Sequence, residues 1–180
     1  DSTAVGIYGV AYAAVSFMGM FSTAFNFLGA PFDSVLESGG KVEEVMRVFR
    51  SVVRWLVVAS VCALVPLAIF STEFITAIYQ SKYASGGLPL AVLAVGFALK
   101  NVLIVHGPIL KALGKSKTLS FNSAAAAVSN VALNLVLIPT FGIVGAAVAT
   151  SLSFVLRDGL ATIQTRHYLG TVPITWQAIG

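Results

Sequence analysis

Lys100 stands inside an otherwise apolar stretch and is the sequence's clearest candidate for chemistry. It is the thirteenth of the 23 residues from Leu88 to Leu110, too central for its amine to reach water easily if the stretch crosses a membrane. On a helical wheel, Lys100 and Lys111 share a face with glycines, about 16 Å apart along the axis. This predicts a pair of cations that receives an anionic group; the alternative is that Lys100 pairs with a carboxylate in a part of the protein that this chain lacks.

Polar side chains of two other kinds also interrupt the apolar runs. His106 lies off the lysine face and is a candidate substrate or proton-relay group, or otherwise a packed polar residue. Asn130 and Asn134 are four residues apart, where amides either bridge helices through hydrogen bonds or line a substrate path.

A polar stripe runs along one side of the first apolar segment. Its members follow spacings of three and four residues: Tyr8, Tyr12, Ser16, Gly19, Thr23 and Asn26. Facing lipid, such a stripe would lose its hydrogen-bond partners, so it should face other helices or a water-filled cavity. Tyr12 and Asn26 are therefore candidates for a substrate path.

The sequence contains few motifs of enzymes, metal sites or cofactor sites. The chain has no phosphate-binding glycine loop, no zinc-ligand spacing and no Ser/His/Asp set. The single Cys62 excludes an internal disulfide framework. We therefore predict a transporter with no catalytic residues, no metal and no cofactor, and the sequence does not specify whether H⁺ or Na⁺ is a coupling ion.

Positioning these side chains requires membrane-spanning helices. The 180 residues are 57% hydrophobic and 10% charged, with a mean hydropathy of +0.91, whereas soluble domains carry roughly a quarter charged residues. Since only helices and closed barrels satisfy the backbone in lipid, and the segments lack the alternation of barrel strands, we predict an all-α integral membrane protein. About five transmembrane helices are expected, at residues 5–28, 53–70, 88–110, 118–138 and 143–163.

The distribution of positive charge predicts the orientation. Nine Lys and Arg residues fall in alternate connections or at the C-terminal end, and one, Lys82, falls on the other side. By the positive-inside rule, the N-terminus of this multi-pass chain lies outside the plasma membrane and its C-terminal end in the cytoplasm. Nucleic-acid binding would require a basic face. These charges are instead distributed by membrane side, which argues against it.

Two connecting segments carry predictions of their own. Residues 41–54 alternate apolar and charged positions at helical spacing, which predicts an interfacial amphipathic helix or a solvated elbow leading into the second span. Residues 171–180 read as the truncated start of a further segment. Because the chain also lacks an initial Met, we interpret residues 1–170 as part of a longer protein.

Several motifs resemble a transporter family. These are YASGGLPLAVLAVGFALKNV, the turn LKALGKSK, an Asn-rich span ending LIPTFG, and a span opening GIVGAAVAT. The chain resembles the C-terminal lobe of polysaccharide or O-antigen flippases of the multidrug/oligosaccharidyl-lipid/polysaccharide exporter superfamily. The resemblance implies a two-lobe transporter with 12 or 14 helices, of which these five spans correspond to helices 8 to 12.

The resemblance also implies a function and partners. It implies translocation of lipid-linked polysaccharide precursors to the outer leaflet by alternating access, by a fragment that would be inactive alone. The partners would be the bilayer, an oligosaccharide on a polyprenyl (pyro)phosphate, and the missing N-terminal lobe. A multidrug/cation antiporter of the same superfamily is the alternative, disfavoured because no central Asp or Glu is expected in the spans. A membrane subunit of a polysaccharide-synthesis enzyme is a second alternative.

Overall fold

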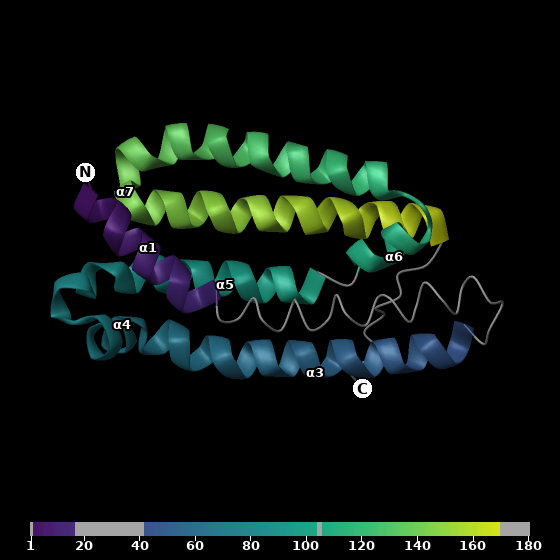
Figure 1. The fold of residues 1–180 in the computed structure, drawn as a ribbon, viewed down its shortest axis with the longest axis horizontal. Helices are drawn as coiled ribbons and strands as arrows, with labels where there is room; N and C mark the ends of the chain where they lie inside the picture. The colour runs from purple at the N-terminus through teal and green to yellow at the C-terminus, as the bar shows by residue number, and fades with distance from the viewer. Residues whose placement is uncertain (1, 17–41, 104–105, 170–180) are drawn as a thin grey trace.

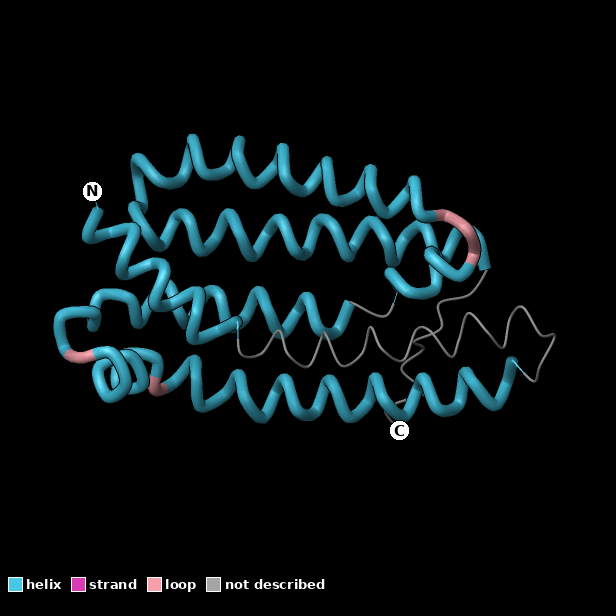
Figure 2. Tube along the Cα trace, viewed as in Figure 1, coloured by secondary structure: helices cyan, strands magenta, loops and turns pink. Residues whose placement is uncertain are grey.

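The computed structural model describes residues 2–16, 42–103 and 106–169, and every element in these ranges is helical (Figures 1 and 2). The elements are α1 (Ser2–Ser16), α3 (Val42–Ile69), α4 (Ser71–Tyr79), the 3-10 helix η1 (Ser81–Gly86), α5 (Gly87–Leu103), α6 (His106–Ala112) and α7 (Ser116–Leu169). The prediction of an all-α chain is confirmed for the described residues.

Two stretches of helix are long and apolar enough to cross a membrane. They are Ser81–Leu103 and Ser116–Tyr168, and a third span arises if the bent pair Val57–Ile69 and Ser71–Tyr79 is counted as one. The second stretch, of 53 residues, is far longer than the roughly 20 that cross a bilayer, so it must contain more than one pass. The protein is therefore membrane-embedded, and the part that the structure describes is all helical.

Helix α7 is a hairpin of two antiparallel arms (Figure 1). The reversal occurs at Gly142, whose φ of 56° and ψ of −134° are not helical. Such a backbone conformation is open chiefly to glycine. Beyond the turn, Gly145 lies directly against the backbone carbonyl of Leu137, where a Cβ would not fit. The predicted spans 118–138 and 143–163 are the two arms, and the tight turn expected between them is confirmed.

The helices stack in layers (Figure 1): the two arms of α7, then α5, then α3, with α1 crossing obliquely against α5 and α7. The buried core lies where α1, α4, α5 and the second arm of α7 meet. Its members are Ala11, Val15, Ile75, Leu90, Leu93, Ala94, Phe97 and Ala147. Small residues permit the closest approach: at Gly96, an added Cβ would overlap the side chain of Ser151.

One predicted boundary differs in the structure, and two other predicted spans are described only in part. The interfacial helix and the second span form one continuous helix, α3, which includes Pro66 and turns by 82° into α4. The expected span 88–110 consists of α5 and α6, separated by residues 104–105, which lie outside the described part. For the first span, the structure describes α1 as far as Ser16; residues 17–28, including Asn26, and the tail 171–180 also lie outside it.

Candidate functional site: a polar cavity between three helices

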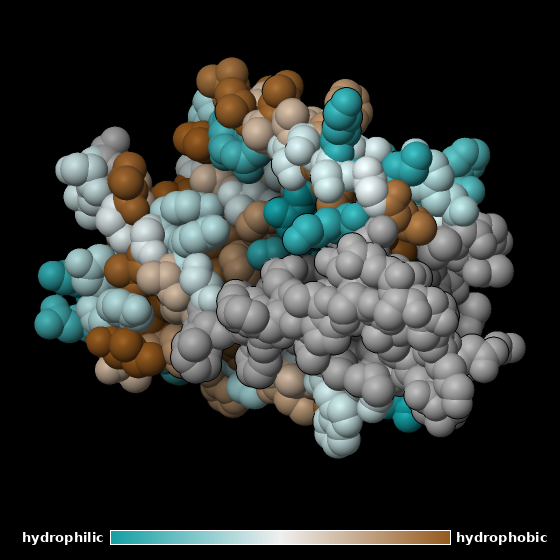
Figure 3. All heavy atoms as spheres, turned by 45° about the vertical axis from the view of Figure 1, so that its right-hand side comes forward, coloured by the Kyte–Doolittle hydropathy of each residue, from teal (hydrophilic) through white to brown (hydrophobic). Residues whose placement is uncertain are grey.

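A cavity of about 350 Å³ lies between α1 and the two arms of α7. It is lined by Tyr12, Ser123, Ala126, Ala127, Asn130, Thr150, Ser153, Phe154 and Arg157. Within each arm of α7 these positions recur at three- and four-residue intervals, which places them on one face of the helix. On the surface shown in Figure 3, hydrophilic residues gather near the middle, between more hydrophobic areas.

Two cations meet at the aromatic ring of Phe154. Lys100 Nζ lies 4.9 Å from the ring centroid, and the Arg157 guanidinium carbon lies 5.9 Å from it. Lys100 is also 4.9 Å from the centroid of Phe97, which packs edge-on against Phe154. A cation over an aromatic face is attracted by the ring quadrupole, so Phe154 holds both charges beside the cavity.

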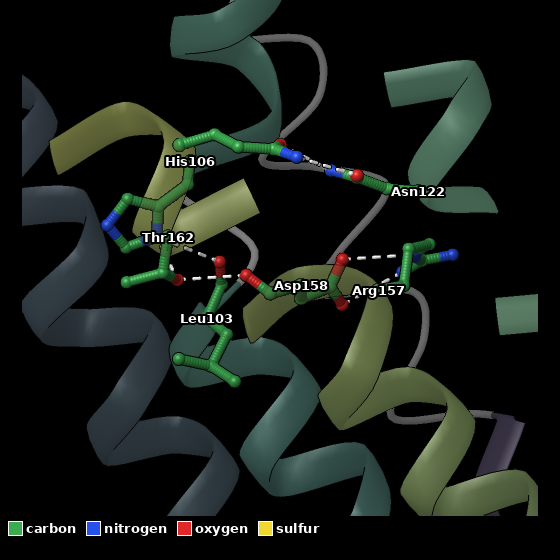
Figure 4. Close-up of polar contacts among 7 residues, drawn as sticks. Leu103, His106, Asn122, Arg157, Asp158 and Thr162 are labelled. Carbon is green, nitrogen blue, oxygen red and sulfur yellow. Dashed lines mark hydrogen bonds and ion pairs between the residues drawn. The ribbon is translucent and has the colours of Figure 1, made fainter. Parts of the chain in front are cut away.

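Arg157 is neutralised by its neighbour along the chain. Its Nε and one terminal nitrogen donate to the two carboxylate oxygens of Asp158 at 2.8 and 2.9 Å (Figure 4). This bidentate geometry is the strongest form of an arginine–carboxylate pair. In the described part of the chain, no carboxylate lies within 4.0 Å of Lys100. Among the described residues, Lys100, Arg157 and Asp158 beside Phe154 therefore sum to one positive charge.

Lys100 lies in the last turn of α5, which ends at Leu103. Because residues 104–105 lie outside the described part, the expectation of a lysine in the middle of one long span stays a prediction. Lys111 is exposed in the last turn of α6. The single helical face predicted for Lys100 and Lys111 crosses residues 104–105, which lie outside the described part, so it stays a prediction.

Asn130 and Asn134 contact each other. The Asn134 amide donates to Asn130 Oδ1 at 3.0 Å along the same helix. Asn130 lines the cavity, whereas Asn134 Oδ1 is buried without a hydrogen-bond partner among the described residues. Neither amide bridges to another described helix, so the bridging interpretation is not observed here. Asn134 instead orients the amide that Asn130 presents to the cavity.

The polar stripe on α1 has three described members, and two of them, Tyr8 and Tyr12, face the other helices as predicted. The third, Ser16, donates to the Tyr12 carbonyl of its own helix at 2.7 Å. The Tyr8 hydroxyl lies 2.9 Å from Thr150 Oγ1 on α7. Tyr12 stacks on Tyr8 with ring centroids 6.2 Å apart and meets Phe97 edge-on at 6.0 Å. These contacts fix Tyr12 at the mouth of the cavity.

His106 is 2% exposed and does not line this cavity. Its Nδ1 lies 3.2 Å from the Leu103 carbonyl and 3.0 Å from Thr162 Oγ1 (Figure 4). Because the Thr162 hydroxyl donates to the Asp158 carbonyl at 2.8 Å, both neighbours of Nδ1 are acceptors. The proton is therefore assigned to Nδ1. This leaves Nε2 as a buried acceptor without a described partner.

Sequence reasoning missed Arg157 and Asp158 as members of the site. Arg157 was counted as a cation at the C-terminal end, although the expected span 143–163 contains it. The expectation of no central carboxylate is also corrected, because Asp158 is 8% exposed within the second arm of α7. The signal was present in the run SFVLRDGLATI, where an adjacent Arg and Asp interrupt apolar residues. No group of three potential metal ligands occurs in the described ranges.

The fold and the cavity define a class: an all-helical, membrane-embedded protein with polar and cationic side chains gathered between its helices. No protein-family model matches the chain. No solved structure matches it significantly.

The chain is similar in sequence to two curated proteins. The chain is 29% identical over 167 residues to a protein of Haloferax volcanii named probable low-salt glycan biosynthesis flippase Agl15, covering 93% of this chain and 34% of the relative. It is 29% identical over 178 residues to the probable flippase AglR of the same organism, covering 96% of this chain and 37% of the relative. The chain thus spans about a third of each relative. The predicted similarity to glycan flippases is confirmed, and membership of the wider superfamily stays a prediction.

Proposed function

We propose that this chain is part of a flippase that moves a lipid-linked oligosaccharide across the membrane by alternating access. Both relatives are named as flippases, one of them in glycan biosynthesis. The remaining two thirds of such a protein would supply a second lobe and close the cavity from the side that this chain leaves open. Transport would then require the whole protein, with the basic connections facing the cytoplasm.

The observation that carries the proposal is the excess positive charge that the described residues place beside a polar cavity. Tyr12, Asn130 and Thr150 offer hydroxyl and amide groups that can bond to sugar hydroxyls. Lys100 and Arg157, held over Phe154, offer the counter-charge for the phosphate or pyrophosphate of a polyprenyl-linked substrate. A site with this charge favours an anion over a cation.

The cation-antiporter alternative depends on Asp158. A buried carboxylate in a transporter is a candidate cation or proton site. Here both carboxylate oxygens already accept hydrogen bonds from Arg157, which leaves the acid little freedom to hold another cation. The pairing therefore favours the flippase.

The test is a flipping assay on the full-length protein in proteoliposomes with a fluorescent polyprenyl-pyrophosphate oligosaccharide. Lys100→Ala should lower the rate about tenfold or more, and Lys100→Arg should retain part of it, because the desolvated cation is what the anionic group requires. Lys82→Ala is the matched control, since Lys82 also lies over an aromatic ring, that of Tyr83 at 5.0 Å, but does not line the cavity. Unchanged transport in Lys100→Ala would remove Lys100 from the substrate path.

A further inference from the structure

A second group of cations gathers at one end of the molecule, away from the cavity. The exposed members are Lys111, Lys115, Lys117 and Arg166. Figure 1 shows that the start of α7, its C-terminal end and α6 lie together at this end, opposite the Gly142 turn and η1. Acidic residues are absent from residues 106–120 and 159–169, so nothing on these segments neutralises the charge.

The backbone holds two of these lysines in one tight turn. Gly114, with a φ of 69°, ends α6 in the left-handed conformation. Its N–H donates to the Lys111 carbonyl at 2.9 Å, and the Lys115 N–H donates to the Leu110 carbonyl at 2.9 Å. This pair of bonds is the Schellman motif, which fixes the direction in which the chain leaves a helix. Lys111 and Lys115 are thus held close together by the fold.

A cation–π contact ties this turn to the far end of α7. Lys115 Nζ lies 4.9 Å from the ring centroid of Tyr168, and the Tyr168 ring lies 5.7 Å from that of His167. Arg166 precedes this aromatic pair directly. The contact therefore brings Lys115 and Arg166, about fifty residues apart in sequence, to the same end of the molecule. Tyr168 lies beside them, and tyrosine is enriched at membrane interfaces.

An apolar stripe begins one helical turn below the lysines. Phe121, Val128 and Leu135 are 69, 70 and 74% exposed. They follow Lys117 at intervals of four and seven residues, so all lie on the same helical face as that lysine. From Phe121 to Leu135 the stripe runs about 21 Å at 1.5 Å per residue, which exceeds the roughly 15 Å depth of one leaflet's hydrocarbon.

We propose that this surface is a binding site for an anionic phospholipid, with the headgroup phosphate on Lys111, Lys115, Lys117 and Arg166 and the acyl chains along Phe121, Val128 and Leu135. The two observations are needed together. The cations alone would suit any phosphate, whereas the exposed apolar stripe on the helical face of Lys117 selects one that carries hydrocarbon chains. The site lies outside the cavity and does not depend on the proposed transport function.

The first experiment measures binding of fluorescent phosphatidylglycerol and phosphatidylcholine to the purified full-length protein in neutral detergent. The wild type should prefer phosphatidylglycerol, and Lys115→Gln/Lys117→Gln should weaken that binding about fivefold for each cation removed. Lys115→Arg/Lys117→Arg should retain the preference. Lys82→Gln, at the opposite end and with the same kind of tyrosine contact, should leave it unchanged.

Three outcomes of the binding experiment would overturn the proposal. They are equal binding of the two lipids by the wild type, an equal loss in Lys82→Gln, and competition by soluble glycerol phosphate as strong as that by the lipid, which would indicate a site for free phosphate. A Phe121→Trp reporter tests the stripe separately. Phosphatidylglycerol with brominated acyl chains should quench the reporter's added fluorescence, whereas no quenching would mean that protein covers the stripe and that the lipid site is wrong.

Discussion

Asn122 and Gln164 exchange two hydrogen bonds across the arms of α7. The Asn122 amide donates to Gln164 Oε1 at 2.6 Å, and the Gln164 amide donates to Asn122 Oδ1 at 2.9 Å (Figure 4). Their positions are nearly symmetric about the Gly142 turn, as the register of an antiparallel hairpin requires. The pair therefore fixes the register of the two arms that form most of the cavity wall.

We expect Asn122→Ala to destabilise the full-length protein by about 1–3 kcal/mol, because the Gln164 amide would be left without its partner. Gln164→Ala should cost a similar amount, and the double variant should cost less than the sum of the two. Unfolding in mixed micelles measures each free energy. Ser120→Ala is the control, since Ser120 is exposed and bonds only to its own helix. Strict additivity would show that the pair is not coupled.

Gly142→Ala should destabilise the protein by about 1–3 kcal/mol, because a Cβ is strained at a φ of 56°. Gly159→Ala, on the same helix, meets no atom within 4 Å and should be neutral or slightly stabilising. Thermal unfolding of both variants in the same detergent provides the comparison. Equal effects of the two substitutions would contradict the assigned hairpin turn.

Asp158→Asn separates the two transport hypotheses. It releases Arg157 from its carboxylate partner and makes the cavity more positive, so flipping of a pyrophosphate-linked substrate should proceed at or above the wild-type rate. A cation antiporter would lose activity on the same change. The proteoliposome flipping rate is the measurement, with Glu73→Gln on α4 as the matched control. Loss of flipping by a folded Asp158→Asn protein would contradict an anion path that needs only the cations.

His106→Leu should destabilise the protein by about 1–2 kcal/mol, because the Leu103 carbonyl and the Thr162 hydroxyl would lose the Nδ1–H donor. His106→Asn should retain most of the stability, since the asparagine Nδ2 occupies nearly the same position as histidine Nδ1. Denaturant unfolding of the full-length protein distinguishes the two variants. If they are equally destabilised, the packing of the imidazole ring, rather than its hydrogen bonds, is what matters.

Much of the architecture followed from local patterns. The hairpin was predicted because only four residues, which include Pro139 and Gly142, join two long apolar runs. So short a connection requires the two helices to be antiparallel neighbours. The inward orientation of the polar stripe of α1 was predicted because lipid offers no hydrogen bonds to Tyr8 or Tyr12. The continuous helix α3 was not foreseen, because a change from amphipathic to apolar composition marks a change of environment and does not by itself end a helix.

The sequence by itself determined that this protein is helical, lies in a membrane and places cations and amides among apolar residues, because composition and periodicity act through local chain geometry and solvent. Only the tertiary structure decided which of them meet. It placed Lys100 and Arg157 on the ring of Phe154, turned Asn134 toward Asn130 rather than toward another helix, and set Lys115 against Tyr168. These contacts join residues through the packing of helices around a shared core, and helical periodicity carries no information about that packing.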